Sequence, residues 1–182
     1  MQQTAAKTRY FLGCKVTRTN GILLSLGLLF ISLVVAAKMN TRYEIRWNIS
    51  ESIKANFFII DKSILPERGE YAAFNYYDIT NEHYKSGMLK TPPQVVFIKK
   101  VIGVAGDTVS QQNREFFVNG QSAGIAKIKS KGGRPLKANE FQGVIPSGYY
   151  YVHTPHKDSY DSRYADVGLI PVTEIRGIAY AH

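Results

Sequence analysis

The fold is decided by the stretch Val95-Val96-Phe97-Ile98-Lys99-Lys100-Val101-Ile102-Gly103-Val104. Its β-branched and aromatic residues, and the lack of a helical period, predict a long strand over residues 95–104. Alternate side chains of a strand point to opposite faces, so Lys99 shares a face with Val101 and Lys100 lies on the other face. The pattern does not decide which lysine is buried. It also fits paired charges that protect a sheet edge from aggregation.

The residues after position 38 predict a mostly β domain. Short β-branched and aromatic runs alternate there with Gly, Pro and Asn, and we find no internal repeat. Asn119-Gly120 predicts a two-residue hairpin turn, because both residues accept positive φ angles. Gly103 and Gly106-Asp107 predict a second reversal. Further strands are expected at residues 57–61, 71–75, 108–112, 115–118 and 149–153, and loops at 81–93, 127–139 and 153–158.

One apolar segment precedes this domain. Residues 21–37 are seventeen residues without a charge, which as a helix would reach about 26 Å, at the short end for a membrane span. The preceding residues contain Lys7, Arg9, Lys15 and Arg18 and no acid. By the positive-inside bias, the N-terminus stays in the cytoplasm and the residues after Lys38 are exported. The sequence therefore predicts a basic cytoplasmic tail (1–20), a transmembrane helix (21–37) and an exported domain (38–182).

The same segment also fits a cleaved secretory signal peptide, because Val35-Ala36-Ala37 matches the general pattern of a cleavage site. Two features favour a retained anchor instead. The apolar run is longer than the core of a usual signal peptide, and Lys38, Arg42 and Arg46 follow it directly.

Composition limits the remaining function classes. With 182 residues and 45% hydrophobic content, the chain can form one ordinary domain plus an appendage. The net charge of +9 does not predict nucleic-acid binding, because four positive charges precede the apolar segment and others are spread over turns. Basic residues flanking a span favour acidic lipid headgroups by roughly 1 kcal/mol each, so membrane lipid is an expected partner. Cys14, the only cysteine, is expected in the cytoplasm, so the exported domain has no disulfide and no cysteine chemistry.

Two short motifs carry hydroxyl groups that could attack a substrate: Asn48-Ile49-Ser50-Glu51-Ser52 and Ser159-Tyr160-Asp161-Ser162-Arg163-Tyr164. Serine attacks only when a base removes its proton. A lysine can be that base if burial lowers its pKa from about 10.4 to about 7.5, which destabilises the charged form by roughly 4 kcal/mol. The chain has four histidines, His83, His153, His156 and His182. Their positions predict neither a Ser-His-Asp triad nor a metal site. We therefore expect no metal or other cofactor.

Spacing within the motifs adds two expectations. Ser50 and Ser52 are two residues apart, so in an extended segment one hydroxyl can attack while the other, with a backbone N–H, stabilises the oxyanion. Asp161 and Arg163 share one strand face by the same spacing. Taken alone, the first motif is more often an exposed linker, and Asn48-Ile49-Ser50 also matches a glycosylation acceptor.

Together these segments make the chain similar to the type I signal peptidases, and most closely to their conjugative-transfer branch, the TraF-type peptidases that mature pilins. The resemblance covers the anchor and most of residues 46–178. The family's serine motif corresponds to Asn48, Ser50, Ser52, Lys54, Asn56 and Phe58, its next box to residues 69–74, its lysine box to residues 98–109, and its last box to residues 159–164 with Gly168 and Pro171.

The resemblance implies a signal-peptidase-like, mostly β domain preceded by one N-terminal transmembrane helix. The implied protein is a single-pass serine endopeptidase of the bacterial inner membrane, with a cytoplasmic N-terminus and a periplasmic catalytic domain. Its implied substrate is a secreted precursor, a conjugative pilin in the TraF branch, from which it removes a signal peptide or propeptide. Some members of that branch cyclise the product, and the sequence does not say whether this chain does.

The resemblance also assigns roles to individual residues. Ser52 would be the nucleophile, and Lys99 rather than Lys100 would be the general base of a serine–lysine dyad. The supporting roles would fall to Ser50 in the oxyanion hole, to Ser159, which would orient the lysine, and to Asp161 and Arg163, which would form a bracing ion pair.

The serine motif departs from the family pattern at three positions, where Lys54, Asn56 and Phe58 replace proline, glycine and tyrosine. Proline would stiffen the segment after the nucleophile, whereas Lys54 leaves it flexible and sets an ammonium on the same strand face as Ser52. A second hypothesis is therefore a catalytically inactive, membrane-anchored assembly protein of a pilus or secretion system with the same fold. A self-cleaving repressor-type peptidase is disfavoured, because it would carry a DNA-binding domain in place of the anchor. The oligomeric state is not predicted.

Overall fold

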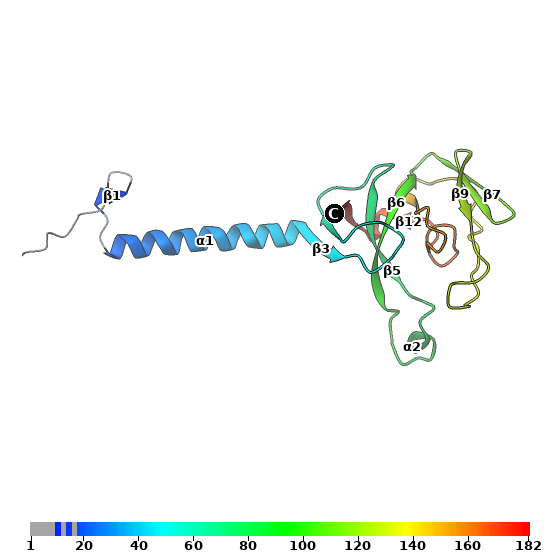
Figure 1. The fold of residues 1–182 in the computed structure, drawn as a ribbon, viewed down its shortest axis with the longest axis horizontal. Helices are drawn as coiled ribbons and strands as arrows, with labels where there is room; N and C mark the ends of the chain where they lie inside the picture. The colour runs from blue at the N-terminus through cyan, green and yellow to red at the C-terminus, as the bar shows by residue number, and fades with distance from the viewer. Residues whose placement is uncertain (1–9, 12–13, 16–17) are drawn as a thin grey trace, which may run out of the picture. The chain divides into compact units, whose positions relative to one another are not determined.

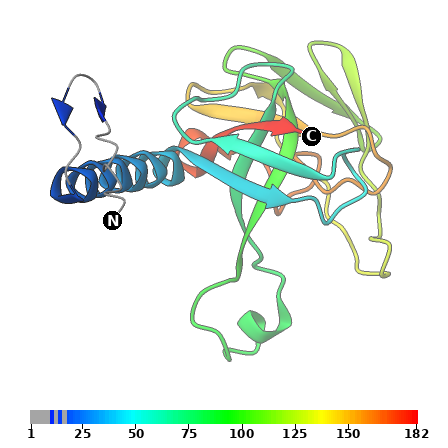
Figure 2. The same cartoon turned by 60° about the vertical axis from the view of Figure 1, so that its left-hand side comes forward.

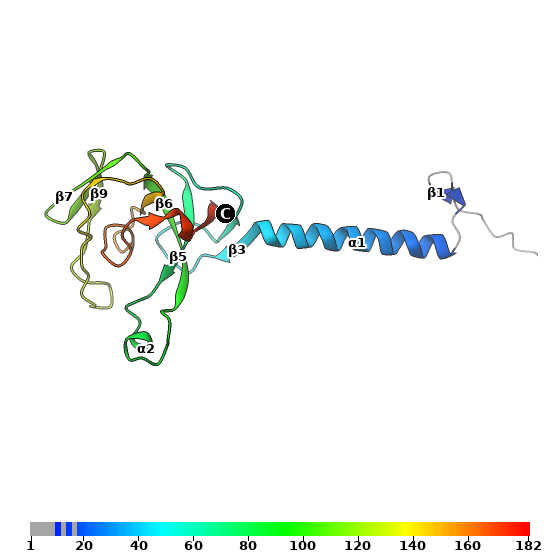
Figure 3. The same ribbon diagram turned by 180° about the vertical axis from the view of Figure 1, so that it is seen from behind.

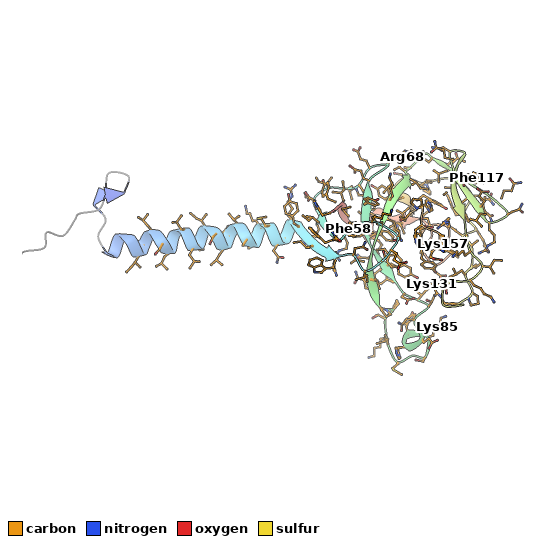
Figure 4. All side chains as sticks on the ribbon, viewed as in Figure 1. Phe58, Arg68, Lys85, Phe117, Lys131 and Lys157 are labelled. Atoms are coloured by element: carbon orange, nitrogen blue, oxygen red, sulfur yellow. The ribbon has the colours of Figure 1, made fainter. Side chains whose placement is uncertain are left out.

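The computed structural model describes residues 10–11, 14–15 and 18–182, and the chain divides into two units, Met1–Thr41 and Arg42–His182. Helix α1 (Arg18–Arg42), drawn in blue in Figure 1, extends beyond the predicted segment 21–37 at both ends. Its Gly21–Arg42 part is long and apolar enough to cross a membrane, with a mean hydropathy of 2.4. Figure 4 shows side chains on both sides of this part of the helix. A pairing of β1 (Tyr10–Phe11) with β2 (Cys14–Lys15) precedes α1, and the charges of Lys7 and Arg9 lie outside the described residues.

A seven-stranded antiparallel sheet is the larger of the two sheets within residues 42–182. Its strand order is β12-β11-β6-β5-β13-β4-β3. Figure 2 shows β3, β4 and β13 side by side, in light blue, cyan and red. Strand β6 is paired on both sides, by β5 and by β11. The strands are β3 (Tyr43–Trp47), β4 (Phe57–Asp61), β5 (Tyr71–Tyr77), β6 (Gln94–Gly103), β11 (Tyr149–His153), β12 (Ile170–Pro171) and β13 (Ile175–Ala181).

A four-stranded sheet contains β10 (Gly143–Val144), β7 (Thr108–Gln112), β8 (Glu115–Val118) and β9 (Gln121–Ile125), in that order. The predicted hairpin turn is confirmed, with φ angles of 51° at Asn119 and 77° at Gly120. The chain also reverses at Gly106 (φ 90°), as predicted, but it then enters the second sheet instead of pairing with β6. In Figures 1 and 3 this smaller sheet and β3 lie at opposite sides of the second unit.

Buried apolar residues of the second unit form three clusters. The first cluster packs against the four-stranded sheet and includes Phe116 and Tyr151. The second lies over β5, β6 and β11 and includes Val101. The third joins β4 to Ile53, a residue of the serine-containing motif. Burial of Ile53 (7% exposed) therefore ties that motif to the sheet.

The connection between β5 and β6 is a long extension that projects from the rest of the unit in Figures 1 and 2. It contains the short helix α2 (Glu82–Lys85), and Figure 4 labels Lys85 there. The side chain of Asn81 caps this helix by accepting from the backbone N–H groups of His83 and Tyr84. The prediction of a loop over residues 81–93 missed this helix, because four residues are too few to show a helical period.

Six strands that were predicted from the sequence pattern are present in the structure. Strands β4, β7, β8 and β11 have the predicted bounds, β5 is two residues longer, and β6 begins and ends one residue earlier. The missed strands are β1, β2, β3, β9, β10, β12 and β13. β3 follows α1 without a turn residue, and β13 is interrupted by Gly177 at a shift in its register with β5. The division into tail, membrane helix and exported domain stays a prediction.

Replacing Gly177 by Ala tests the tight packing at this register shift. Gly177 has a φ of 152°, and an added Cβ would lie 2.1 Å from the carbonyl oxygen of Asp61 and 2.9 Å from Cα of Lys62. Backbone atoms cannot rotate away, so we expect the free energy of unfolding to fall by about 3 kcal/mol. Gly106→Ala is the matched control, because its φ is 90° but nothing lies within 4 Å, and we expect it to lose about 1 kcal/mol. Urea unfolding of the full chain in detergent compares the two variants, and equal losses would contradict the steric argument.

Candidate active site

The serine-containing segment between β3 and β4 is a turn, whereas the interpretation of the Ser50–Ser52 spacing assumed an extended segment. The side chain of Asn48 organises it: Nδ2 donates to the carbonyl oxygens of Ile53 and Ala55, both at 2.8 Å, and Oδ1 accepts from the backbone N–H of Ser50 at 3.1 Å. The hydroxyls of Ser50 and Ser52 are nevertheless adjacent, with 3.0 Å between the two Oγ atoms. The expected closeness of the two hydroxyls therefore arises from a side-chain-stabilised turn.

Of the two lysines on β6, the structure buries Lys99 and exposes Lys100. Lys99 is 7% exposed, and its Nζ donates to Ser52 Oγ at 3.3 Å and to Ser159 Oγ at 3.1 Å. The ring of Phe97 lies 6.0 Å from the same nitrogen. Ser52 and Ser159, which are 47 and 60 positions away from Lys99 in the sequence, thus contact the same amine.

Burial lowers the pKa of Lys99 below its ordinary value of 10.5, because the ammonium loses its hydration. The negative charge of Asp161 acts in the opposite direction, and the positive charge of Arg163 adds to the lowering. The amine can therefore lose its proton at a lower pH than an exposed lysine.

Asp161 and Arg163 form a buried ion pair, but the segment 159–164 is a loop, whereas the shared-face interpretation assumed strand spacing. Arg163 donates to Asp161 through Nε at 2.8 Å, Nη2 at 2.9 Å and its backbone N–H at 3.3 Å. Nη2 also donates to the carbonyl oxygen of Ser159 at 3.1 Å. Ser162 attaches the loop to β11 by exchanging two hydrogen bonds with Val152, of 2.9 and 3.1 Å. These bonds, rather than strand alternation, bring Asp161 and Arg163 together.

The ion pair is closed off from water, with Asp161 0% and Arg163 4% exposed. Burial alone would raise the pKa of Asp161, but hydrogen bonds from His153 and Arg163 and the positive charges beside it lower that pKa below the ordinary value. Asp161 therefore stays ionised and keeps a negative charge behind Lys99.

Two residues of the site had no role in the sequence-based assignment. Asn48 holds the serine turn, and its signal was the short Asn-x-Ser spacing, which is typical of an Asx turn. His153 Nδ1 lies 3.0 Å from Asp161 Oδ2. No sequence signal identified His153, because it reaches Asp161 only through the attachment of the 159–164 loop to β11.

A cleft of about 910 Å³ opens over these groups. Its lining includes Ser50, Ser52, Lys99 and Ser159. Apolar residues of β3, β4 and β6 form much of the wall, and Phe58 and Lys131 of the lining are labelled in Figure 4. Asp161 and Arg163 do not line the cleft, so they can act only through the residues in front of them.

Lys54 does not share a strand face with Ser52, because the segment is a turn. Lys54 is exposed and does not line the cleft; it lines an adjoining hollow with Asn56 and His182. Within residues 10–11, 14–15 and 18–182, no group of three or more His, Cys, Asp or Glu side chains is placed to hold a metal ion.

Comparison with known proteins adds independent information. A family model described as signal peptidase, peptidase S26, matches residues 18–181. A probable conjugal transfer protein TraF of Sinorhizobium fredii is 39% identical over 85 residues, which cover 45% of this chain and 43% of that protein. Signal peptidase I of Pseudomonas fluorescens is 26% identical over 161 residues, covering 68% of this chain and 52% of that protein. The chain thus spans about half the length of these two relatives. A crystal structure of a signal peptidase I from Enterococcus faecalis matches with a TM-score of 0.34 and 22% identity, covering 62% of this chain and 95% of that one.

Replacing Lys99 by Met tests whether the buried amine destabilises the fold. The pKa of Lys99 is lower in the folded protein than its ordinary value of 10.5, so between these two values the unfolded chain binds more protons. Wild-type stability should therefore rise with pH across this window, whereas Lys99→Met should lack this rise. Below the window Lys99→Met should be the more stable protein, by about 1.4 kcal/mol for each unit of pKa shift. Urea unfolding at several pH values measures the difference. Exposed Lys100→Met is the control and should follow the wild type.

Replacing Asp161 by Asn leaves the guanidinium of Arg163 buried without a counter-charge. We expect the free energy of unfolding to fall by about 3–5 kcal/mol, the usual result of removing one partner of a buried pair. The control is Glu140→Gln, which breaks a pair with Lys137 whose side chains are 79% and 68% exposed, and should change stability by less than about 1 kcal/mol. Chemical denaturation compares them, and a loss in Asp161→Asn as small as in the control would refute a structural role for the pair.

Proposed function

The chain belongs to the signal peptidase family, peptidase S26, and on this premise we propose that it is a membrane-anchored serine endopeptidase with a Ser52–Lys99 dyad. The observation that carries the proposal is the position of Lys99 Nζ, which is buried and lies 3.3 Å from Ser52 Oγ and 3.1 Å from Ser159 Oγ. A nucleophile, a base and a group that orients the base are the three parts of an activated serine.

In the proposed reaction, neutral Lys99 accepts the proton of Ser52 while Oγ attacks the scissile carbonyl carbon. The oxyanion that forms is stabilised by the hydroxyl of Ser50, which lies beside Ser52 Oγ at 3.0 Å, and by a backbone N–H. Collapse of the tetrahedral intermediate breaks the peptide bond, and Lys99 passes its proton to the leaving amine. Water, activated by the same lysine, then hydrolyses the acyl-enzyme.

The geometry of β6 supports an extended peptide as the substrate. β11 pairs only with the Lys100–Gly103 end of β6, and no strand within the described residues pairs with the same edge of residues 94–99. Those residues line the cleft together with the serine turn. A peptide added along this free edge would gain backbone hydrogen bonds and lead its scissile bond toward Lys99. The substrate proposed is therefore a precursor protein bound in extended conformation.

The pilin-type substrate is a finer proposal, supported by the conjugal transfer protein to which part of the chain is similar. We place α1 in the bacterial inner membrane, with a cytoplasmic N-terminus and a periplasmic catalytic domain. An enzyme and a precursor held in one membrane meet at a raised effective concentration. The acyl group can pass to water or to the precursor's own N-terminal amine, and these acceptors give a linear or a cyclic product.

The test is co-expression of the full chain with a pilin-like precursor encoded on the same plasmid, with product masses as the readout. We expect Ser52→Ala and Lys99→Ala to lower processing by at least about 10³-fold, and Ser50→Ala by about 10²-fold. Ser110→Ala and Lys100→Ala are matched controls, because both residues are exposed and neither lines the cleft. A product lighter by one water than the linear peptide identifies cyclisation.

Unchanged processing in Ser52→Ala would overturn the mechanism. Loss of processing in Ser50→Ala but not in Ser52→Ala would make Ser50 the nucleophile. If the wild type itself leaves every tested precursor intact while assembly of the pilus still requires the chain, the inactive assembly protein is the correct function.

A further inference from the structure

His153 lies at the end of β11, where its side chain is 12% exposed. Its Nδ1 is 3.0 Å from Oδ2 of Asp161, a carboxylate that is 0% exposed. His153 does not line the cleft, so it cannot touch a substrate bound there. Its contact with the site runs through Asp161.

The bonds of Asp161 show what His153 adds. Oδ1 accepts from Arg163 Nε at 2.8 Å, and Oδ2 accepts from Arg163 Nη2 at 2.9 Å. His153, a residue of β11, supplies an additional hydrogen-bond donor to Oδ2 of Asp161. The carboxylate is thereby held between a loop and a strand, and it cannot turn without breaking a buried hydrogen bond.

The same carboxylate acts on the base. Asp161 raises the pKa of Lys99 and Arg163 lowers it, while burial dominates both effects. The positions of these groups are linked, because Arg163 donates to the carbonyl oxygen of Ser159, whose hydroxyl meets Lys99 Nζ. A donor that binds Asp161 therefore changes how strongly the ammonium form of Lys99 is held.

We propose that His153 is a positioning residue that fixes the carboxylate of Asp161 against Arg163 and so limits the attraction of that carboxylate for the Lys99 ammonium. The inference rests on the proposed function, since it concerns the base of that reaction. A hydrogen bond from His153 shares the charge of Asp161, so less of it remains to stabilise a protonated Lys99. Without His153, the lysine should keep its proton to higher pH and be a base over a narrower range.

Several charged or titratable groups lie near His153. Asp161 and Arg163 face it from the 159–164 loop. Lys100 of β6 is the cross-strand neighbour of His153. Tyr71 of β5 is the cross-strand neighbour of Lys100 on its other side. A protonated His153 still donates through Nδ1 and adds a positive charge beside the carboxylate, which acts in the same direction as the neutral donor.

The test compares His153→Ala with His153→Asn, whose amide can place a donor near the position of Nδ1. His83→Ala, on exposed α2, is the matched control. The full chain in detergent is assayed for kcat/KM against pH on a precursor peptide. We expect the acidic limb to move upward by about 0.5–1 pH unit in His153→Ala with KM unchanged, and to return to the wild-type position in His153→Asn. A role in stability alone would lower activity at every pH and leave the limb in place.

A second readout does not depend on cleavage. In chains labelled with ¹³C at the lysine Cε and carrying Ser52→Ala, the titration of Lys99 should also shift upward when His153→Ala is added. If both the limb and this titration stay unchanged, the inference about His153 is overturned and the proposed dyad still stands. If the Ser52→Ala chain cleaves substrate, the dyad fails, while the titration still decides whether His153 acts on Lys99.

Discussion

Burial of the Lys99 side chain is the constraint on which the rest of the site depends. A lysine on the interior face of a sheet needs space and partners, and both are provided locally. Its cross-strand neighbour on β5 is Ala72, a small residue that leaves room for the lysine stem along the sheet. The hydroxyls of Ser52 and Ser159 satisfy the amine in place of water. Asp161 and Arg163 have opposite effects on the ammonium, so the loss of hydration decides its pKa.

The contact between Lys99 and Ser52 depends in turn on the curvature of the sheet. Ser52 follows β3, which lies four strands from β6 in the sheet order, so a flat sheet would separate the two strands by about 19 Å. Ser52 lies in the turn after β3, so this turn and the twist of the sheet together bring its Oγ to within 3.3 Å of Lys99 Nζ. Gly177 lies in β13, between these strands, at a register shift of the kind that bends and twists a strand. The close approach of Gly177 to Asp61 thus contributes to the geometry of a site that it does not touch.

Sequence pattern was sufficient where a strand alternates cleanly between turn residues, as in β7 and β8 around Asn119-Gly120. It was insufficient for β13, whose glycine and exposed end weaken the period. In the site, alternation could separate Lys99 from Lys100 but could not say which was buried, because that depends on the loop that covers one face. The contact of His153 with Asp161 left no trace in the sequence for the same reason. The local pattern was compatible with burial of either lysine, and the tertiary contacts decided which one is buried.

The turn around Lys54 illustrates how such contacts can fix a segment that contains no proline. Proline would restrict the backbone at this position by fixing one φ angle. In this chain, Asn48 Nδ2 donates to the carbonyl oxygens on either side of Lys54, those of Ile53 and Ala55, both at 2.8 Å. Ile53 is also buried in the third core cluster. The segment is therefore held by the side chain of Asn48 and by the burial of Ile53 in the core, while Lys54 is exposed to solvent. Asn48 and Ile53 thus fix the backbone around Ser52 although residue 54 is not proline.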